Sequence, residues 1–174
     1  LTSQDGLPAC DLNANTASVA THLQVAAYSD QDSDVNDPLT MLIRNDRAVN
    51  AQELTAPVVL AGFMTKTPLS GTRYQGVSGY PSHFIDDTDT DDAYHISLLA
   101  GQTVELTVSD WSIPTTEEEF YATPDFDLYL YKDYDSTSPV DASFGYGPSE
   151  QVTVPEDGNY YVLVHAVNGT SNYT

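Results

Sequence analysis

The chain has 174 residues, of which 40% are hydrophobic and 10% aromatic, and this is too apolar for a wholly disordered polypeptide. Acidic residues outnumber basic residues by 26 to 5, which gives a formal net charge of −21. Such a charge repels nucleic acid and anionic membrane surfaces. The sequence also contains no apolar run of the roughly 20 residues that a membrane span needs. We therefore expect neither nucleic acid nor a membrane as a partner.

The first 40 residues are interpreted as an N-terminal extension. Residues 1–20 are rich in Asn, Thr, Ser, Ala and Asp, which is typical of a linker or a loosely attached arm. Residues 21–28 alternate, with Leu23 and Val25 on one face, and predict one strand. Asp30, Asp32 and Asp34 follow with the 1-3-5 spacing of a calcium loop, but the Gly and Glu that an EF-hand needs are missing. A polar linker is the preferred interpretation of this acidic run, and a metal role is the alternative.

The first residue and the single cysteine of the chain are considered for what they indicate about the precursor and its compartment. It starts at Leu1 with neither an initiator Met nor a signal-peptide pattern, so we expect an internal piece of a longer precursor. The single cysteine, Cys10, cannot form an internal disulfide and says little about the compartment.

Residues 41–174 carry the pattern of an all-β domain. A helical turn is predicted over 45–54, with Asn45 or Asp46 as its N-cap, and loops are predicted over 67–82 and 112–124. Short apolar or alternating segments predict strands over 57–64, 94–98, 103–108, 126–131, 140–144, 151–154, 159–167 and 172–174. We predict an antiparallel, jelly-roll-like β-sandwich of about eight or nine strands.

Two turns in this domain are predicted to join neighbouring strands. Ala100-Gly101-Gln102 lies between the segments 94–98 and 103–108, which we expect to form a strand pair. Asn168-Gly169 is a hairpin signal ahead of the last strand.

Five aspartates within seven residues precede the strand over 94–98. Carboxylates this close repel one another without a counter-ion, and calcium takes six to eight oxygen ligands. A cation site is one hypothesis for this segment, and a solvated acidic loop is the alternative. The residues are Asp86, Asp87, Asp89, Asp91 and Asp92.

The sequence shows no catalytic constellation, and we predict no catalytic residue. The four histidines are scattered, and Gly76-Val77-Ser78-Gly79 lacks the spacing of a nucleophile elbow. The paired carboxylates Asp125 and Asp127 have the composition of a glycosidase site, but ordering a turn is the preferred role for them.

Tyr129, Tyr131 and Tyr161 form a second candidate site. Alternation places them opposite the apolar rows of their strands, where exposed tyrosines can stack against sugars or a peptide. The alternative is that they form a second layer of the core.

Four stretches resemble, in order, the bacterial pre-peptidase C-terminal domain. They are NDRAVNAQEL from residue 45, DTDDAYHISLLAGQTVELTV from residue 89, DFDLYLY from residue 125 and EQVTVPEDGNYYVLVHAVNGTSNY from residue 150. The resemblance implies a jelly-roll-like β-sandwich that is attached to a secreted peptidase and removed during maturation. The lead-in over residues 32–38 resembles the segment before such domains in subtilisin-like peptidases.

The resemblance implies a non-catalytic accessory domain that aids secretion, maturation or substrate adhesion. Its partners would be the catalytic domain of the parent peptidase and a protein or polysaccharide substrate, and its location would be extracellular. The alternative function is a carbohydrate- or matrix-binding module that uses an aromatic sheet face.

The family's relatives also imply a cofactor, Ca²⁺. The collagen-binding domains of clostridial collagenases bind calcium between an Asn-Asp and an Asp-x-x-Asp, and the glutamates that precede their Asn-Asp correspond here to Met41 and Ile43. Tyrosines that bind collagen on their last long strand correspond here to His165 and Val167. The residues that match the calcium motif are Asn45, Asp46, Asp89 and Asp92.

Overall fold

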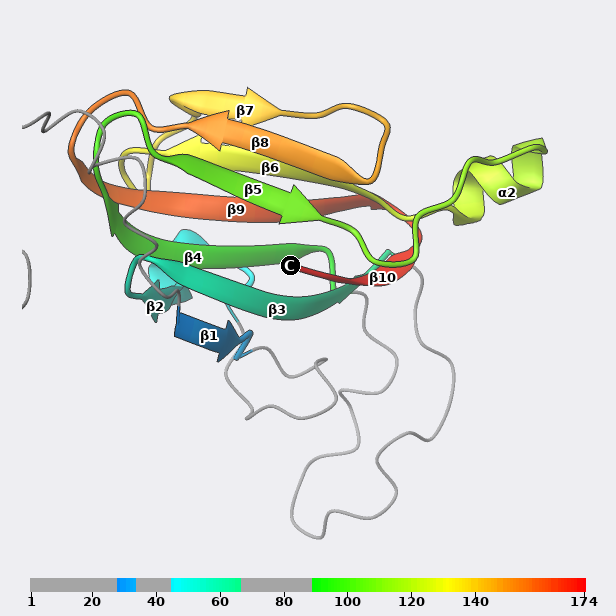
Figure 1. The fold of residues 1–174 in the computed structure, drawn as a ribbon, viewed down its shortest axis with the longest axis horizontal. Helices are drawn as coiled ribbons and strands as arrows, with labels where there is room; N and C mark the ends of the chain where they lie inside the picture. The colour runs from blue at the N-terminus through cyan, green and yellow to red at the C-terminus, as the bar shows by residue number, and fades with distance from the viewer. Residues whose placement is uncertain (1–27, 34–44, 67–88) are drawn as a thin grey trace, which may run out of the picture.

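The computed structural model describes residues 28–33, 45–66 and 89–174, and this part of the chain contains ten strands (Figure 1). The strands are β1 (Tyr28–Gln31), β2 (Gln52–Leu54), β3 (Val58–Thr65), β4 (Asp91–Leu98), β5 (Thr103–Thr107), β6 (Asp125–Tyr131), β7 (Asp141–Ser143), β8 (Ser149–Thr153), β9 (Gly158–Asn168) and β10 (Thr170–Tyr173). A 3₁₀ turn, η2 (Ala48–Asn50), and one helix, α2 (Glu117–Ala122), complete the described elements. None of these helices is long and apolar enough to cross a membrane.

The strands form two layers. The first layer is a five-stranded sheet in the order β2-β4-β9-β6-β7. The second layer contains β1-β3-β10 and the pair β5-β8. These two parts are joined, because Val108 bridges to Tyr173 and because the backbones of Thr107 and Thr174 exchange hydrogen bonds of 2.7 and 2.9 Å. The second layer therefore runs β1-β3-β10-β5-β8.

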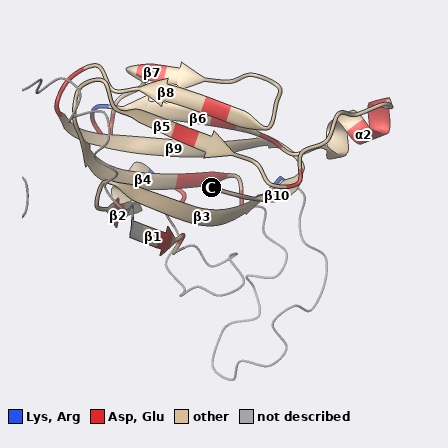
Figure 2. Cartoon of the chain, in the orientation of Figure 1, with Lys and Arg blue, Asp and Glu red and all other residues tan. Residues whose placement is uncertain are grey.

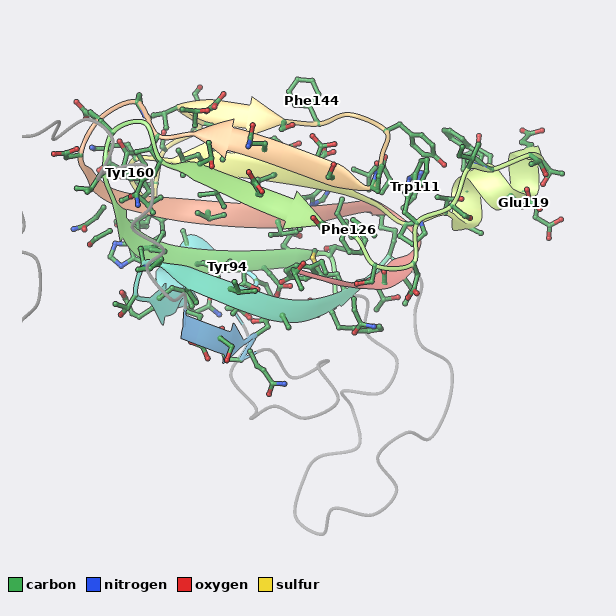
Figure 3. The ribbon with its side chains drawn as sticks, viewed as in Figure 1. Tyr94, Trp111, Glu119, Phe126, Phe144 and Tyr160 are labelled. Carbon is green, nitrogen blue, oxygen red and sulfur yellow. The ribbon has the colours of Figure 1, made fainter. Side chains whose placement is uncertain are left out.

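The core lies between the two layers, and Figure 3 labels three of its members, Tyr94, Phe126 and Tyr160. The first layer contributes the inward row of β6, in which Phe126, Leu128 and Leu130 are at most 1% exposed, as the alternation predicts. The remaining buried members come from β4, β9 and the second layer and include Tyr94, Ile96, Leu98, Tyr160, Val162, Val164, Ala166, Met64, Leu106, Val108, Val152, Val154 and Tyr173. The prediction of an all-β sandwich is confirmed.

Two turns connect different layers rather than paired strands, so both pairing predictions are wrong. β4 pairs with β2 and β9, whereas β5 pairs with β8. The turn at Gly101, with φ of +81°, carries the chain from one layer to the other. Gly169, with φ of +70°, does the same between β9 and β10, because β10 pairs with β3. Turn chemistry predicts a reversal of direction and does not determine the partner strand.

The N-terminal edge departs from a purely antiparallel sandwich. β1 pairs with β3 and β2 pairs with β4, and both pairings are parallel. The strand expected over residues 21–28 lies outside the described residues except at Tyr28, where β1 begins. The domain boundary at residue 40, the loop over 67–82, Asp86, Asp87, Met41, Ile43 and Cys10 also lie outside them.

Two short elements differ from the sequence predictions. The turn η2 starts after Arg47, which makes no side-chain cap, so the predicted N-cap at Asn45 or Asp46 is wrong; the side chain of Asn45 is used in the core instead. The segment 112–124 contains the helix α2, where the sequence pattern predicts a loop. The hydroxyl of Thr116 caps α2 by accepting from the Glu119 N–H, and three glutamates in the first turn suit the positive end of the helix dipole.

Candidate functional site

A buried polar cluster lies where β4, β10 and the end of β1 meet. The hydroxyl of Tyr173 donates to Oδ2 of Asp92 at 2.6 Å and lies 3.5 Å from Oδ2 of Asp32. Nδ2 of Asn45 donates to Oδ1 of Asp32 at 2.8 Å, and the hydroxyls of Tyr94 and Tyr173 share a hydrogen bond. Asp32, Asn45 and Asp92 are fully buried. We call Asp32, Asn45, Asp92, Tyr94 and Tyr173 the buried polar cluster.

The electrostatics of the buried polar cluster keep Tyr173 protonated. Burial raises the pKa of Tyr173 well above its ordinary value of 10.0, and the negative charge of Asp92 raises it further. A phenol that keeps its proton is a donor, and a carboxylate is an acceptor only. Tyr173 is therefore a hydrogen-bond donor to Asp92 within the core.

The structure brings two of the four predicted metal ligands into the buried polar cluster. Asn45 and Asp92 belong to it, and the backbone of Asn45 also accepts from the Ala93 N–H at 2.8 Å. Asp46 follows Asn45 and is half-buried. Asp89 is 3% exposed, and its backbone forms an antiparallel bridge with Thr65.

Calcium is the group that the family resemblance implies, and the buried polar cluster suits it in ligand type. All side chains in the cluster offer oxygen, which calcium prefers. Oδ1 of Asn45 is buried and takes part in no hydrogen bond within the described part of the chain. The number of carboxylates is small, however: over residues 28–33, 45–66 and 89–174, no three His, Cys, Asp or Glu side chains converge on one point. Asp32, Asn45 and Asp92 would hold the ion, with backbone and water supplying further oxygens.

The second candidate site is the outward face of the first layer. Tyr131 on β6 is the register partner of Tyr161 on β9, which is in turn the partner of His95 on β4. The rings of Tyr161 and His95 lie 4.6 Å apart, and those of Tyr129 and Tyr131 stack at 6.4 Å. All three tyrosines are half-buried, and the inward row of β9 is the one that starts at Tyr160. We call Tyr129, Tyr131, Tyr161 and His95 the aromatic face.

Carboxylates border the aromatic face. On β4, His95 lies 2.8 Å from the carboxylate of Glu53, its register partner on β2. Next to the rings, the hydroxyl of Tyr129 donates to Oδ2 of Asp127 at 2.8 Å. Burial raises the pKa of Tyr129 to about 12, and the hydrogen bond to Asp127 contributes to this shift. The face therefore combines aromatic rings with hydrogen-bond acceptors.

One end of the aromatic face carries an ion pair. Nδ1 of His165 lies 2.8 Å from Oδ1 of Asp91, and His165 is also the register partner of Asp127. The hydrogen bond to Asp91 raises the pKa of His165, against the opposing effect of burial. Burial acts to raise the pKa of Asp91, but hydrogen bonds from His165 and Thr90 outweigh it and hold the pKa below its usual value.

The carboxylate pair Asp125 and Asp127 is largely buried, since each is 8% exposed. A bulge in the pairing of β6 with β9 falls between Asp125 and Phe126. Burial raises the pKa of Asp125, and the neighbouring Asp127 raises it further. Asp127 accepts from Tyr129, so its role in this structure is to hold a ring of the aromatic face.

Sequence reasoning misses three members of the buried polar cluster, namely Asp32, Tyr94 and Tyr173. Asp32 belongs to the 1-3-5 aspartate run, for which a metal role is the alternative to a polar linker. Tyr173 belongs to a strand whose pairing with β3 the pattern does not predict, so nothing in the sequence points it at Asp92.

The chain has structural similarity to solved domains. The chain is similar to the pre-peptidase C-terminal domain of a collagenase from Bacillus anthracis, with 14% sequence identity and a TM-score of 0.37 over 71% of this chain and 90% of that chain. Neither a family model nor a curated protein matches the chain. The matched domain bears the family name that the four sequence stretches resemble. At this identity and TM-score the match assigns no residue and no activity to the chain.

Proposed function

We propose that the chain is a non-catalytic accessory domain of a secreted bacterial peptidase, and that its aromatic face adheres to the substrate of that peptidase. The observation that supports adhesion is the placement of Tyr129, Tyr131 and Tyr161 side by side on one outward sheet face. The peptidase context rests on the four sequence stretches, and a subtilisin-like parent rests on the lead-in over residues 32–38.

The chemistry of the aromatic face suits an extended polymer. Tyrosine rings offer large rigid contact surfaces with a polar tip, which favours both peptide and sugar ligands. The carboxylates of Glu53 and Asp127 next to the rings accept hydrogen bonds from amides or hydroxyls. Protein fibres are the preferred ligand because the parent is expected to be a peptidase. A polysaccharide is the second candidate, and stacking on flat rings is the observation that favours it.

Acidic residues limit which polymers the domain can bind. Asp and Glu residues are spread over both layers and α2, with few Lys or Arg among them (Figure 2). With a formal net charge of −21, the domain repels polyanions. The substrate is therefore expected to be neutral or basic.

Calcium binding at Asp32, Asn45 and Asp92 is the second part of the proposal. The ion would tie the end of β1 and the segment before η2 to β4 and β10, which are joined at the buried polar cluster. It would offset the charges of Asp32 and Asp92, and its role would be structural rather than catalytic.

Co-sedimentation of the intact chain with insoluble fibres tests the adhesion proposal. The probes are insoluble collagen as a protein fibre, and cellulose and chitin as polysaccharides. Sedimentation with collagen supports the proposal, and sedimentation with the polysaccharides alone supports the carbohydrate-binding alternative. An absence of binding to all three contradicts both.

A further inference from the structure

A second group of aromatic rings shares no member with the aromatic face and lies where α2 projects beyond one end of the two layers (Figure 1). The ring of Phe120 on α2 stacks on Tyr146 with the centroids 4.7 Å apart, and Tyr146 also meets Trp111 edge-on at 6.2 Å. Tyr121 meets Phe120 edge-on at 5.5 Å. Figure 3 labels Trp111 beside α2. We call Trp111, Phe120, Tyr121 and Tyr146 the aromatic corner.

The fold does not cover α2. None of its residues is buried, and Phe120 and Tyr121 are 41% and 64% exposed. A helix of this length is marginal on its own, but hydrogen bonds at its start hold it. Thr116 caps it, and the carboxylate of Glu119 accepts from the N–H and the hydroxyl of Thr115, both at 2.7 Å. α2 therefore holds two aromatic side chains in a defined position without packing them into the core.

The loop that carries Tyr146 is anchored on both sides of this residue. Glu150 accepts from the Gly145 N–H at 3.0 Å, and the backbone of Gly147 forms a hydrogen bond with Asp125. Glu150 and Asp125 are buried, so water does not compete for these bonds. The stack of the Tyr146 ring on α2 is consequently held from the body of the domain.

Acidic side chains border the aromatic corner, and no cation accompanies them. Figure 2 shows acidic residues on α2. Two of them, Glu117 and Glu118, are exposed, and neither side chain forms a hydrogen bond or an ion pair with another residue that the structure describes. The segments 109–123 and 141–150, which build the corner, contain no Lys, Arg or His. The charge of this surface is therefore complementary to a cationic partner.

Spacing along α2 brings carboxylates and a ring together. Glu117 precedes Tyr121 by four residues and Glu118 precedes it by three, so both are its neighbours on the helix surface. A guanidinium group can lie over the ring of Tyr121 while its N–H groups reach one of these carboxylates. The ammonium group of lysine is not planar and is more strongly hydrated, so it gains less from the ring. The arrangement favours arginine over lysine.

We propose that the aromatic corner is a docking surface for an arginine-bearing segment of a partner polypeptide, with a guanidinium group on Tyr121 beside the carboxylates of Glu117 and Glu118. A second copy of this chain fits less well, because two chains that each have a formal net charge of −21 repel. A purely apolar segment would cover the rings but take water from the carboxylates without replacing it. Docking at the aromatic corner is independent of adhesion at the aromatic face.

Peptide binding to the intact chain tests the proposal. The probes are fluorescein-labelled Gly-Arg-Gly-Arg-Gly-Arg-Gly and its counterparts with Lys or Gln in place of Arg, and fluorescence anisotropy measures their affinity. We expect saturable binding of the arginine peptide, binding of the lysine peptide that is weaker by about threefold or more, and no saturable binding of the glutamine peptide. Amide NMR spectra should show shifts in residues 117–122 when the arginine peptide binds.

Substitutions on α2 should weaken the binding of the arginine peptide. We expect a loss of about threefold or more in Tyr121→Ala and a similar loss in the double variant Glu117→Gln with Glu118→Gln. Because α2 buries no residue, these variants should keep the fold and nearly the melting temperature of the unmodified chain.

The turn over residues 133–135 provides matched controls, because it places an exposed tyrosine between two exposed aspartates. Tyr134→Ala removes a ring that is 62% exposed, close to the value for Tyr121. The double variant Asp133→Asn with Asp135→Asn removes the same charge as the double glutamate variant. Both controls should bind the arginine peptide as the unmodified chain does.

Several results would overturn the proposal. No binding, equal binding of the arginine and lysine peptides, or unchanged binding by Tyr121→Ala would leave at most a general attraction between charges. Saturable binding of the glutamine peptide would assign the surface to an apolar partner, and a dimer that Tyr121→Ala dissociates would assign it to a second copy. Loss of peptide binding in Tyr131→Ala with Tyr161→Ala would place the peptide on the aromatic face instead.

Discussion

The hydroxyl of Tyr173 lies 2.6 Å from Oδ2 of Asp92, although the two residues are 81 positions apart in the chain. This hydrogen bond joins the last strand of the second layer to β4 of the first. Both side chains are buried, so neither exchanges this partner for water. The buried polar cluster is consequently a point where the two layers are held in one register.

Removing the hydroxyl in Tyr173→Phe tests that role. The free energy of unfolding should fall by about 1–3 kcal/mol, because a buried carboxylate loses a hydrogen-bond donor without gaining water. Denaturant unfolding followed by circular dichroism measures the change. The matched control is Tyr161→Phe on the half-buried aromatic face, where we expect a change within about 0.5 kcal/mol. Equal losses in the two variants would contradict a special role for Tyr173.

Gly62 makes room for the same tyrosine. A Cβ atom at this position would lie closer to Cζ of Tyr173 than real contacts allow. Gly62→Ala should therefore lower the free energy of unfolding by about 1–3 kcal/mol through overpacking. Gly147→Ala is the control, because a Cβ atom there would have no neighbouring atom within 4 Å. Thermal unfolding of both variants is the measurement, and an unchanged melting temperature for Gly62→Ala would show that the ring moves away at no cost.

The pair His165 and Asp91 makes stability depend on pH. The raised pKa of His165 gives a contribution that is complete below its ordinary value of 6.5 and is lost as pH rises through the folded-state pKa. The lowered pKa of Asp91 gives a contribution that is present above 3.8 and is lost as pH falls through the folded-state pKa. The pair should thus stabilise most between pH 3.8 and 6.5.

The contribution of the ion pair to the free energy of unfolding is small, because the side chains of His165 and Asp91 are 33% and 34% exposed. We expect about 1 kcal/mol or less. Denaturant unfolding from about pH 5 to about pH 9 measures it, with His165→Gln and Asp91→Asn as variants that should each flatten the profile. Asp127 and Lys66 also face His165, so a decrease in stability that persists in both variants would assign the pH dependence to other groups.

Calcium should stabilise the chain if Asp32, Asn45 and Asp92 hold it. For a dissociation constant typical of extracellular calcium modules, about 10 mM calcium adds about 2 kcal/mol. Differential scanning calorimetry in calcium and in EDTA is the measurement, and magnesium is the control ion. Asp92→Asn should lose the shift because it removes a carboxylate from the cluster. A melting temperature that is the same in calcium and in EDTA would contradict the calcium proposal.

The sequence pattern predicts strands far better than it predicts which strands pair. The alternation around Leu128 and Tyr160 reports burial directly, so the predicted positions of β6 and β9 are confirmed. The partner of a strand depends on contacts that are distant in sequence, which explains the wrong pairing of β4 with β5. The sequence pattern does not predict helix α2, although Thr116 and Glu119 have the spacing of a capping box.

The candidate sites also differ in whether a local sequence pattern is enough to predict them. The tyrosines of the aromatic face follow from alternation within β6 and β9, so a local pattern is enough to predict that they share a face. The buried polar cluster joins residues 32, 45, 92 and 173, which come together when the two layers pack against each other. The family motif supplies Asn45 and Asp92, while Asp32 and Tyr173 need the structure.

The most direct test of the adhesion account is the binding of insoluble collagen by the chain with Tyr131→Ala and Tyr161→Ala together. The control is Tyr134→Ala, which removes a tyrosine that is 62% exposed after the end of β6 and is not a member of the aromatic face. We predict that the double variant stays folded by circular dichroism, with a lowered melting temperature because two half-buried rings are lost, and that it binds at least about thirty-fold more weakly, as expected when central aromatic contacts are lost. The control should bind as the unmodified chain does. Equal binding by all three proteins, or no binding by the unmodified chain, would contradict the account.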